Sequence, residues 1–201
     1  MDRKPYLMCA LLLLATFAAA QPAAKSKAKS SAPPATMAST LDAELSHVES
    51  DFVSAADAMP ADKYDFAPSN GEFKGVRTFA MQVKHVAAVN YIIAAAMAGE
   101  KPPVDVGTIE SGPDTLKTKA EIMQYLKDSF AYTHKVFATL APQNALKPVP
   151  LPWDPKNNST RLGMAAHEIA HPFDHYGQMV EYLRMNGIVP PASRPQPQPA
   201  Q

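Results

Sequence analysis

Apolar residues recur at intervals of three and four positions in four segments of the chain, and this spacing predicts four helices. The segments cover residues 39–59, 77–98, 118–140 and 160–187. The second segment is apolar around most of its circumference, which indicates a helix buried among the others. No segment shows the alternation of apolar and polar residues that a half-buried strand requires. The expected fold is therefore all-α, a four-helix bundle.

The connections between these helices carry their own signals. Residues 99–116 contain glycines and prolines and have no helical period, and a connection of this length in a small domain is typical of a crossover or of a lid over a site. Residues 141–158 are rich in proline and contain the only tryptophan, Trp153, which is expected to plug the end of the core rather than to line a pocket. Thr118 and Glu121 match a capping box at the start of the third helix.

The first 20 residues have the features of a secretory signal peptide: a basic start, an apolar run over residues 6–17 and three alanines before Gln21. The run is too short to span a bilayer once folded, so no stable membrane insertion is expected after cleavage. The only cysteine, Cys9, lies in this segment, and the mature chain therefore has no thiol for a disulfide or a nucleophile. We expect an exported protein, periplasmic or secreted.

The mature chain is expected to hold a single domain at residues 39–194. Residues 21–38, mostly Ala, Lys, Ser and Pro, are predicted to be a flexible linker, and residues 195–201 a disordered tail. The formal net charge is +0 and the domain has no basic block, so nucleic acid is not an expected partner.

The last helix contains three of the six histidines, His167, His171 and His175, at intervals of four residues. A step of four residues turns about 400° around a helix, so the three imidazoles line one face. Such a face could hold a divalent metal, and a tetrahedral site with an open position then needs a further ligand from another segment. Pro172 removes a helical hydrogen bond, and we expect a kink beside His171. A helix that bends around a core is the simpler alternative.

The second helix offers one candidate for the further ligand, His85, which shares an apolar face with Val89 and Ile92. A lone histidine in such a place is usually a hydrogen-bonded core residue. Metal sites in four-helix bundles are built from inward side chains of facing helices, however, which favours ligation here. His47 and His134 lie off the apolar stripes and are expected on the surface.

Residues 167–171 also match H-E-x-x-H, the zinc-protease pattern in which two histidines bind zinc and a glutamate, here Glu168, activates water. Three features count against a protease. Pro172 follows the second histidine directly, Asp174 stands where the longer metzincin pattern has glycine, and no strand that could bind an extended substrate precedes the helix. The protease remains the less favoured alternative.

Two longer stretches, MPADKYDFAPSNGEFKGVRTFAMQVKHVAAVNY and HPFDHYGQMVEYLRMNGIVPP, resemble the DinB-like family of damage-inducible, YfiT-related proteins. The resemblance covers nearly all of residues 39–194. Its more specific part is the pattern H-x-x-x-H-x-G-Q, followed by YLR-x-x-G-x-x-PP. The family includes thiol-dependent S-transferases, relatives of mycothiol-dependent isomerases and many members with no assigned activity.

The resemblance implies an up-down-down-up bundle, which would explain the long connection before the third helix. It also implies a divalent metal, commonly zinc or nickel in relatives, held by three histidines. Carried over by position, these are His85, His171 and His175. His167 then supports the ligands or packs in the core, with replacement of another ligand as the alternative.

Two functions follow from these patterns. The first is a metal-dependent hydrolase or transferase that acts on a small-molecule substrate, with Glu168 as the candidate catalytic base. Glu168, Asp174 and Gln178 are also candidates to orient the imidazoles, since metal-bound histidines usually donate their other N–H to an oxygen. The second is a metal-binding module without turnover, with a homodimer through the apolar helices left open. An accessible polar pocket over the metal would favour the enzyme.

Overall fold

The computed structural model describes residues 34–195 of the chain. The expected signal peptide, most of the expected linker and the tail beyond Pro195 lie outside the described residues. The first helix starts at Met37, two residues before the expected start at residue 39, so the last two residues of the expected linker are helical. Residues 34–195 form one compact unit.

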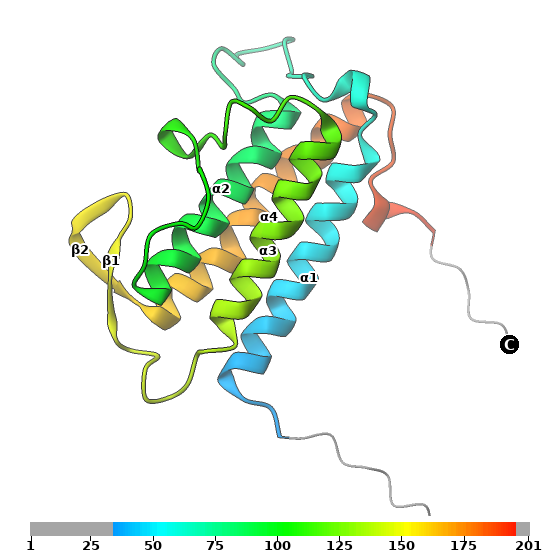
Figure 1. The fold of residues 1–201 in the computed structure, drawn as a ribbon. Coiled ribbons are helices and arrows are strands. Elements are labelled where there is room, and N and C mark those ends of the chain that lie inside the picture. The colour runs from blue at the N-terminus through cyan, green and yellow to red at the C-terminus, as the bar shows by residue number, and fades with distance from the viewer. Residues whose placement is uncertain (1–33, 196–201) are drawn as a thin grey trace, which may run out of the picture. The chain divides into compact units, whose positions relative to one another are not determined.

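Four helices make up this unit, in agreement with the predicted all-α bundle: α1 (Met37–Ala58), α2 (Phe79–Ala98), α3 (Lys119–Phe137) and α4 (Arg161–Met185). In Figure 1, α1 runs up the bundle, α2 and α3 both run down it, and α4 runs up again. Each helix contacts two others, since α2 and α1 each pack against both α3 and α4. The long connection between α2 and α3 returns the chain to the top of the bundle, as a crossover must (Figure 1).

All four helices begin at a threonine whose hydroxyl accepts a hydrogen bond from a backbone N–H of the first turn. Such a cap satisfies one of the amide groups that a helix start leaves without a partner. At α3 the predicted capping box forms, because the Glu121 carboxylate accepts from the backbone N–H of Thr118 at 2.8 Å. The four N-cap residues are Thr36, Thr78, Thr118 and Thr160.

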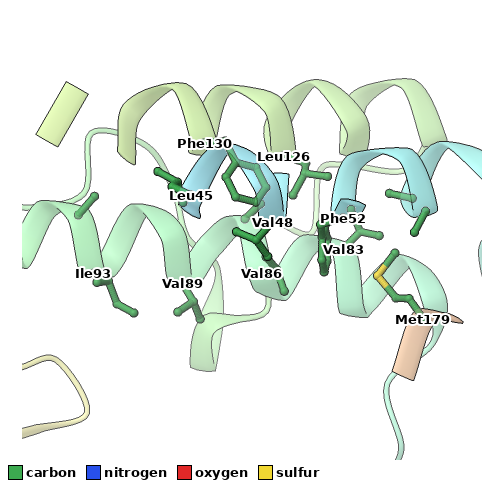
Figure 2. Close-up of a cluster of buried hydrophobic side chains, with 14 of the residues drawn as sticks. Leu45, Val48, Phe52, Val83, Val86, Val89, Ile93, Leu126, Phe130 and Met179 are labelled. Atoms are coloured by element: carbon green, nitrogen blue, oxygen red, sulfur yellow. The ribbon is translucent and has the colours of Figure 1, made fainter. Parts of the chain in front are cut away.

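The core lies along α2, which is buried on most of its surface, as its apolar circumference predicted. Figure 2 shows the apolar side chains of α1, α2 and α3 meeting between the helices, with Phe52 close to Val83 and Phe130 above Val86. The Phe52 and Phe130 rings lie 6.5 Å apart in a tilted arrangement. α2 is long and apolar enough to cross a membrane, but 78% of that stretch is buried inside the bundle, which accounts for its hydropathy.

A short antiparallel hairpin precedes α4, where the sequence predicted only a loop. Its strands are β1 (Pro148–Leu151) and β2 (Asp154–Thr160), and the pairing slips between Pro150 and Leu151. The hairpin stands beside the bundle in Figure 1. Four consecutive residues of β2 are exposed, so this strand has no alternation of apolar and polar residues. Trp153 lies in its turn and is 49% exposed, so the expectation that it plugs the core is wrong.

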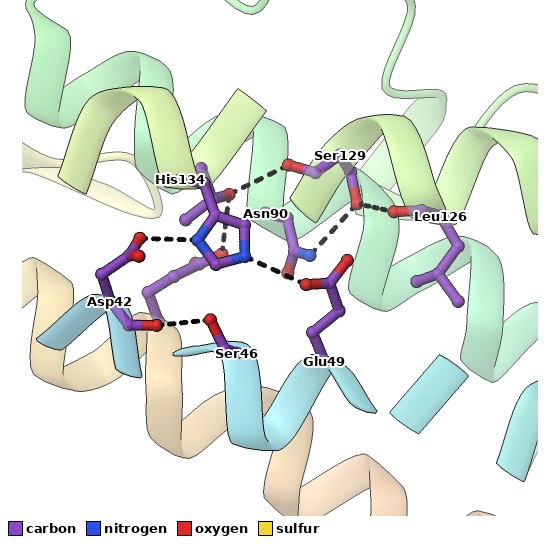
Figure 3. Close-up of polar contacts among 9 residues, drawn as sticks. Asp42, Ser46, Glu49, Asn90, Leu126, Ser129 and His134 are labelled. Atoms are coloured by element: carbon purple, nitrogen blue, oxygen red, sulfur yellow. Dashed lines mark hydrogen bonds and ion pairs between the residues drawn. The ribbon is translucent and has the colours of Figure 1, made fainter. Parts of the chain in front are cut away.

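His134 of α3 was expected on the surface, and the structure instead places it between α3 and α1. Its Nδ1 lies 2.6 Å from Asp42 Oδ1, and its Nε2 lies 3.0 Å from Glu49 Oε2, both on α1. Figure 3 shows the ring between the two carboxylates. Burial lowers the pKa of His134, but the hydrogen bonds to Asp42 and Glu49 outweigh it, and the net pKa is raised above 6.5. The protonated ring therefore links the two helices.

We expect His134→Gln to reduce the free energy of unfolding by about 1 kcal/mol below pH 6.5, because a partly buried pair of ionic contacts is lost. A histidine whose pKa is raised by folding stabilises the protein fully below its unfolded-state pKa. The difference between wild type and variant should therefore shrink as the pH rises through the folded-state pKa. Urea unfolding across this range measures it, with the exposed His47→Gln as control. A pH-independent difference would contradict the ionic link.

Candidate metal centre

Three histidines from two helices converge inside the bundle. His171 and His175 lie one turn apart on α4, and His85 faces them from α2. The Nε2 atom of His171 lies 3.2 Å from His85 Nε2 and 3.1 Å from His175 Nε2. One nitrogen of each ring lies within 4.8 Å of the others, and the group is the one cluster of potential metal-binding side chains found among residues 34–195.

Two of the rings are held in a defined tautomer by their other nitrogen. His85 Nδ1 lies 2.8 Å from the carbonyl oxygen of Glu110, and His175 Nδ1 lies 2.6 Å from Gln82 Oε1. Both oxygens can only accept, so each Nδ1 carries the proton and donates it. The Nε2 atoms of His85 and His175 therefore present lone pairs to the same point.

These nitrogens suit a divalent metal. Two nitrogens bound to one zinc at about 2.0–2.1 Å and a tetrahedral angle lie roughly 3.3 Å apart, close to the spacing here. A proton on His171 Nε2 could pair with only one of the two facing lone pairs, whereas a cation satisfies all of them together. His171 Nδ1 is buried and has no hydrogen-bond partner among the described residues.

The three rings are also neutral at neutral pH, as ligation requires. Burial is the largest cause and lowers the pKa of His85, the pKa of His171 to about 3 and the pKa of His175 to about 4. Neighbouring rings and the charge of Arg77 lower the His171 pKa further. The site thus disfavours protons while leaving lone pairs free for a metal.

The crossover between α2 and α3 supplies the Glu110 carbonyl through an unusual backbone. Ile109 and Glu110 both adopt positive φ angles, 52° and 57°, which residues other than glycine rarely do. The loop closes tightly around them, since a Cβ on Gly107 would meet the Gly112 carbonyl oxygen at 2.1 Å. Such strain persists where surrounding structure enforces it and is concentrated at functional sites. The long connection thus positions one wall of the site.

A row of amides and one carboxylate orients His175. Gln82 Nε2 donates to Gln178 Oε1 at 2.8 Å, and Gln178 Nε2 donates to Asp174 Oδ2 at 3.2 Å. Gln178 and Asp174 were expected to contact an imidazole directly, but in the structure Gln82 lies between them and the ring. Gln82 was missed, although its position three residues before His85 on one helix places it on the same face.

His167 does not join the cluster. It is exposed, and its ring lies against Trp153 of the hairpin with a centroid separation of 4.9 Å. Its ring is stacked 6.2 Å from that of His171, which is ring packing and not convergence on one point. The expectation of a core histidine is wrong, and His167 and His171 do not assemble the two-histidine centre of an H-E-x-x-H protease.

Glu168 points away from solvent into the interior between α2, α3 and α4, where it is fully buried. Its Oε1 accepts from Thr133 at 3.4 Å, and its Oε2 has no partner among the described residues. Figure 3 draws the Asn90 amide with its Nδ2 toward the Ser129 hydroxyl, to which it donates at 3.1 Å. Turned over, the same amide accepts from Ser129 and donates to Glu168 Oε1 at 3.1 Å. Burial raises the pKa of Glu168 to about 8, so its carboxyl group is neutral at pH 7.

α4 passes through Pro172 as one continuous helix, within which Pro172 is buried. Proline has no N–H, so the Glu168 carbonyl lacks its usual helical partner at this point. The histidines on either side, His171 and His175, still share one face of the helix and reach the same point. The missing hydrogen bond therefore lies inside the segment that carries the site.

Comparison with known proteins agrees with this architecture. The family model of the DinB superfamily matches residues 44–179. A crystal structure of the DinB-like protein YjoA from Bacillus subtilis superposes with a TM-score of 0.57 at 15% identity, covering 74% of this chain and 92% of that one. No curated protein matches the sequence significantly. The family match spans more than half of the sequence, and the chain therefore belongs to the DinB superfamily.

Proposed function

We propose that this protein binds one divalent metal, zinc or nickel, through His85, His171 and His175, and uses it in a hydrolase or transferase reaction on a small-molecule substrate. The observation that carries the proposal is the convergence of the Nε2 atoms, with the His85 and His175 tautomers set by Glu110 and Gln82. Three protein ligands are the number typical of catalytic zinc sites, which keep one position open, whereas structural sites use four.

A metal held in this way would supply a Lewis acid that polarises a substrate oxygen or lowers the pKa of a substrate group. The chain's own residues have two roles in this proposal. Gln82 and the Glu110 carbonyl hold the ring protons of His175 and His85 away from the metal position. The surrounding apolar helices exclude bulk water and keep the rings neutral.

Glu168 remains the candidate base named from the sequence, but its surroundings favour a different role. A base must reach a substrate proton directly or through one water molecule. The hydrogen bonds of Glu168 run to Thr133 and Asn90 inside the bundle, and none of those in the described part of the chain joins it to a histidine. We propose that it shapes the interior beside α4.

Metal binding is tested on the mature chain, residues 21–201, by elemental analysis after dialysis. We expect close to one metal per chain in wild type and in His167→Ala, and less than a tenth of that in His85→Ala, His171→Ala and His175→Ala. Trp153 is the only tryptophan, and it lies against His167, whose ring is 6.2 Å from that of the proposed ligand His171. Ni²⁺ bound by His171 should therefore also quench its fluorescence. Metal that depends on His167 and not on His85 would contradict the proposed site.

A metal-binding module without turnover is the second candidate function, and one observation favours it. His85 and His175 are each only 6% exposed, so the metal position has little open surface. Metal-loaded protein assayed against ester, amide and phosphate substrates distinguishes the two functions. Turnover lost in His171→Ala supports the enzyme, and stoichiometric metal without turnover supports the module.

The proposed setting is outside the cytoplasm, as the N-terminal 20 residues predict. Mass spectrometry of the protein expressed with its full N-terminus would identify the first residue, which we expect to be Gln21. A protein that keeps residues 1–20 and stays in the cytoplasm would contradict export.

A further inference from the structure

A cleft of about 410 Å³ lies beside the histidine cluster, where α2, α4 and the crossover meet. The residues that line it include Arg77, Met81, Gln82, Ile109, Ser111 and Gln178. Gln82 and Gln178 belong to the row of amides that ends on His175. The cleft therefore shares a wall with the proposed metal centre, and its volume suits a small molecule.

Arg77 is the charged residue among those that line the cleft. It directly precedes the cap of α2 and is half-buried. No carboxylate in residues 34–195 forms an ion pair with its guanidinium.

The row of amides has a carboxylate at its far end, that of Asp174, which forms no ion pair with Arg77. Asp174 accepts a hydrogen bond from Gln178, which orients one of its oxygens toward that amide. Three neutral imidazoles leave the charge of a divalent metal uncompensated. A group bound between the metal and Arg77 would therefore face positive charge on both sides.

Resting on the proposed metal centre, we infer that this cleft binds the anionic group of a small substrate, a carboxylate or a phosphate, with Arg77 as the residue that selects it. A guanidinium donates two parallel hydrogen bonds to either group, and Arg77 has no competing ion pair within residues 34–195. The strained segment at the cleft adds support, since Ile109 is 84% exposed in a left-handed conformation. An exposed isoleucine held in this way is placed to contact a ligand rather than the core.

The test measures binding of two probes, succinate and inorganic phosphate, to nickel-loaded and metal-free mature protein by calorimetry. We expect wild type to bind at least one probe and Arg77→Met to bind it about 10- to 100-fold more weakly, the range for a lost hydrogen bond to a charged group. Arg77→Lys should recover part of the affinity because it restores the charge. Arg194→Met, which changes an exposed arginine bonded to the Val189 carbonyl, should match wild type. The two probes separate carboxylate from phosphate recognition.

The outcomes separate this inference from the proposed function. Equal affinity of wild type and Arg77→Met, or no binding of either probe to nickel-loaded wild type, would overturn the anion site even if elemental analysis finds metal. Wild type that holds no metal but still binds a probe through Arg77 would support the anion site and contradict the metal centre. Gln178→Glu, which places a carboxylate in the cleft, should weaken probe binding, and unchanged binding would count against the inference.

Discussion

Loading the metal-free protein with Zn²⁺ or Ni²⁺ should raise its free energy of unfolding by about 4 kcal/mol when free metal is 1,000 times the dissociation constant. A ligand that binds only the folded chain stabilises it by mass action, and the three ligands converge only when α2 and α4 are packed together. For a domain of this size the gain corresponds to about 10 °C in Tm. Thermal unfolding followed by circular dichroism, with and without a chelator, measures it.

The matched control is His171→Ala, which removes the central ring of the cluster. We expect its Tm to be the same with metal and with chelator, whereas His167→Ala should keep the wild-type response because that ring lies outside the cluster. For each protein the measured quantity is the difference in Tm between metal and chelator, and not the absolute Tm, since removing a buried imidazole also changes packing. A metal-dependent shift that persists in His171→Ala would mean that the metal binds elsewhere.

Glu168→Gln should make the protein more stable at neutral pH, on the order of 3 kcal/mol at pH 7. Burial raises the pKa of Glu168 from 4.5 to about 8, so the folded chain keeps this carboxyl protonated while the unfolded chain releases the proton. The sign follows from the raised pKa. The contribution of the Glu168 carboxyl group to the free energy of unfolding is fully present below pH 4.5. It is lost as the pH rises toward 8, at about 1.4 kcal/mol for each pH unit. Glutamine has nearly the same shape and remains neutral throughout.

Urea unfolding of wild type and Glu168→Gln between pH 4.5 and pH 8 tests this effect, which spans the two pKa values. The two proteins should have nearly equal stability at the acidic end and diverge as the pH rises. Glu181→Gln, on the exposed side of the same helix, should follow wild type at every pH. Parallel curves for Glu168→Gln and wild type would show that Glu168 is ionised in the folded protein and would contradict its raised pKa.

Much of the fold could be predicted from local patterns in the sequence. Helix spacing depends on burial of one face, and that requirement is visible along the chain whatever the partner helix is. The start of α3 at Thr118 was predictable for the same reason, because a cap and its amide lie within one turn. The hairpin was not predictable, since its strands contain Pro148 and Pro150 and have little apolar surface to alternate.

The candidate site was likewise predictable where it depends on local spacing and not where it depends on helix packing. The interval between His171 and His175 places them on one helix face from sequence alone, and His85 stood out as a histidine on an apolar helix. The resemblance to the DinB-like family selected the same three residues. The distance between the α2 and α4 rings, however, depends on how the helices pack, which no local pattern determines.

The sequence by itself determined the four helices, the cap of α3 and the residues able to bind a metal, because these depend on neighbours within a few turns. Only the tertiary structure decided that His167 faces Trp153, that Glu168 is buried, and that His134 joins α3 to α1. It also brought Glu110 and Gln82 to the rings of His85 and His175. Residues distant in sequence meet only through packing, and packing sets the charge state and orientation of each side chain.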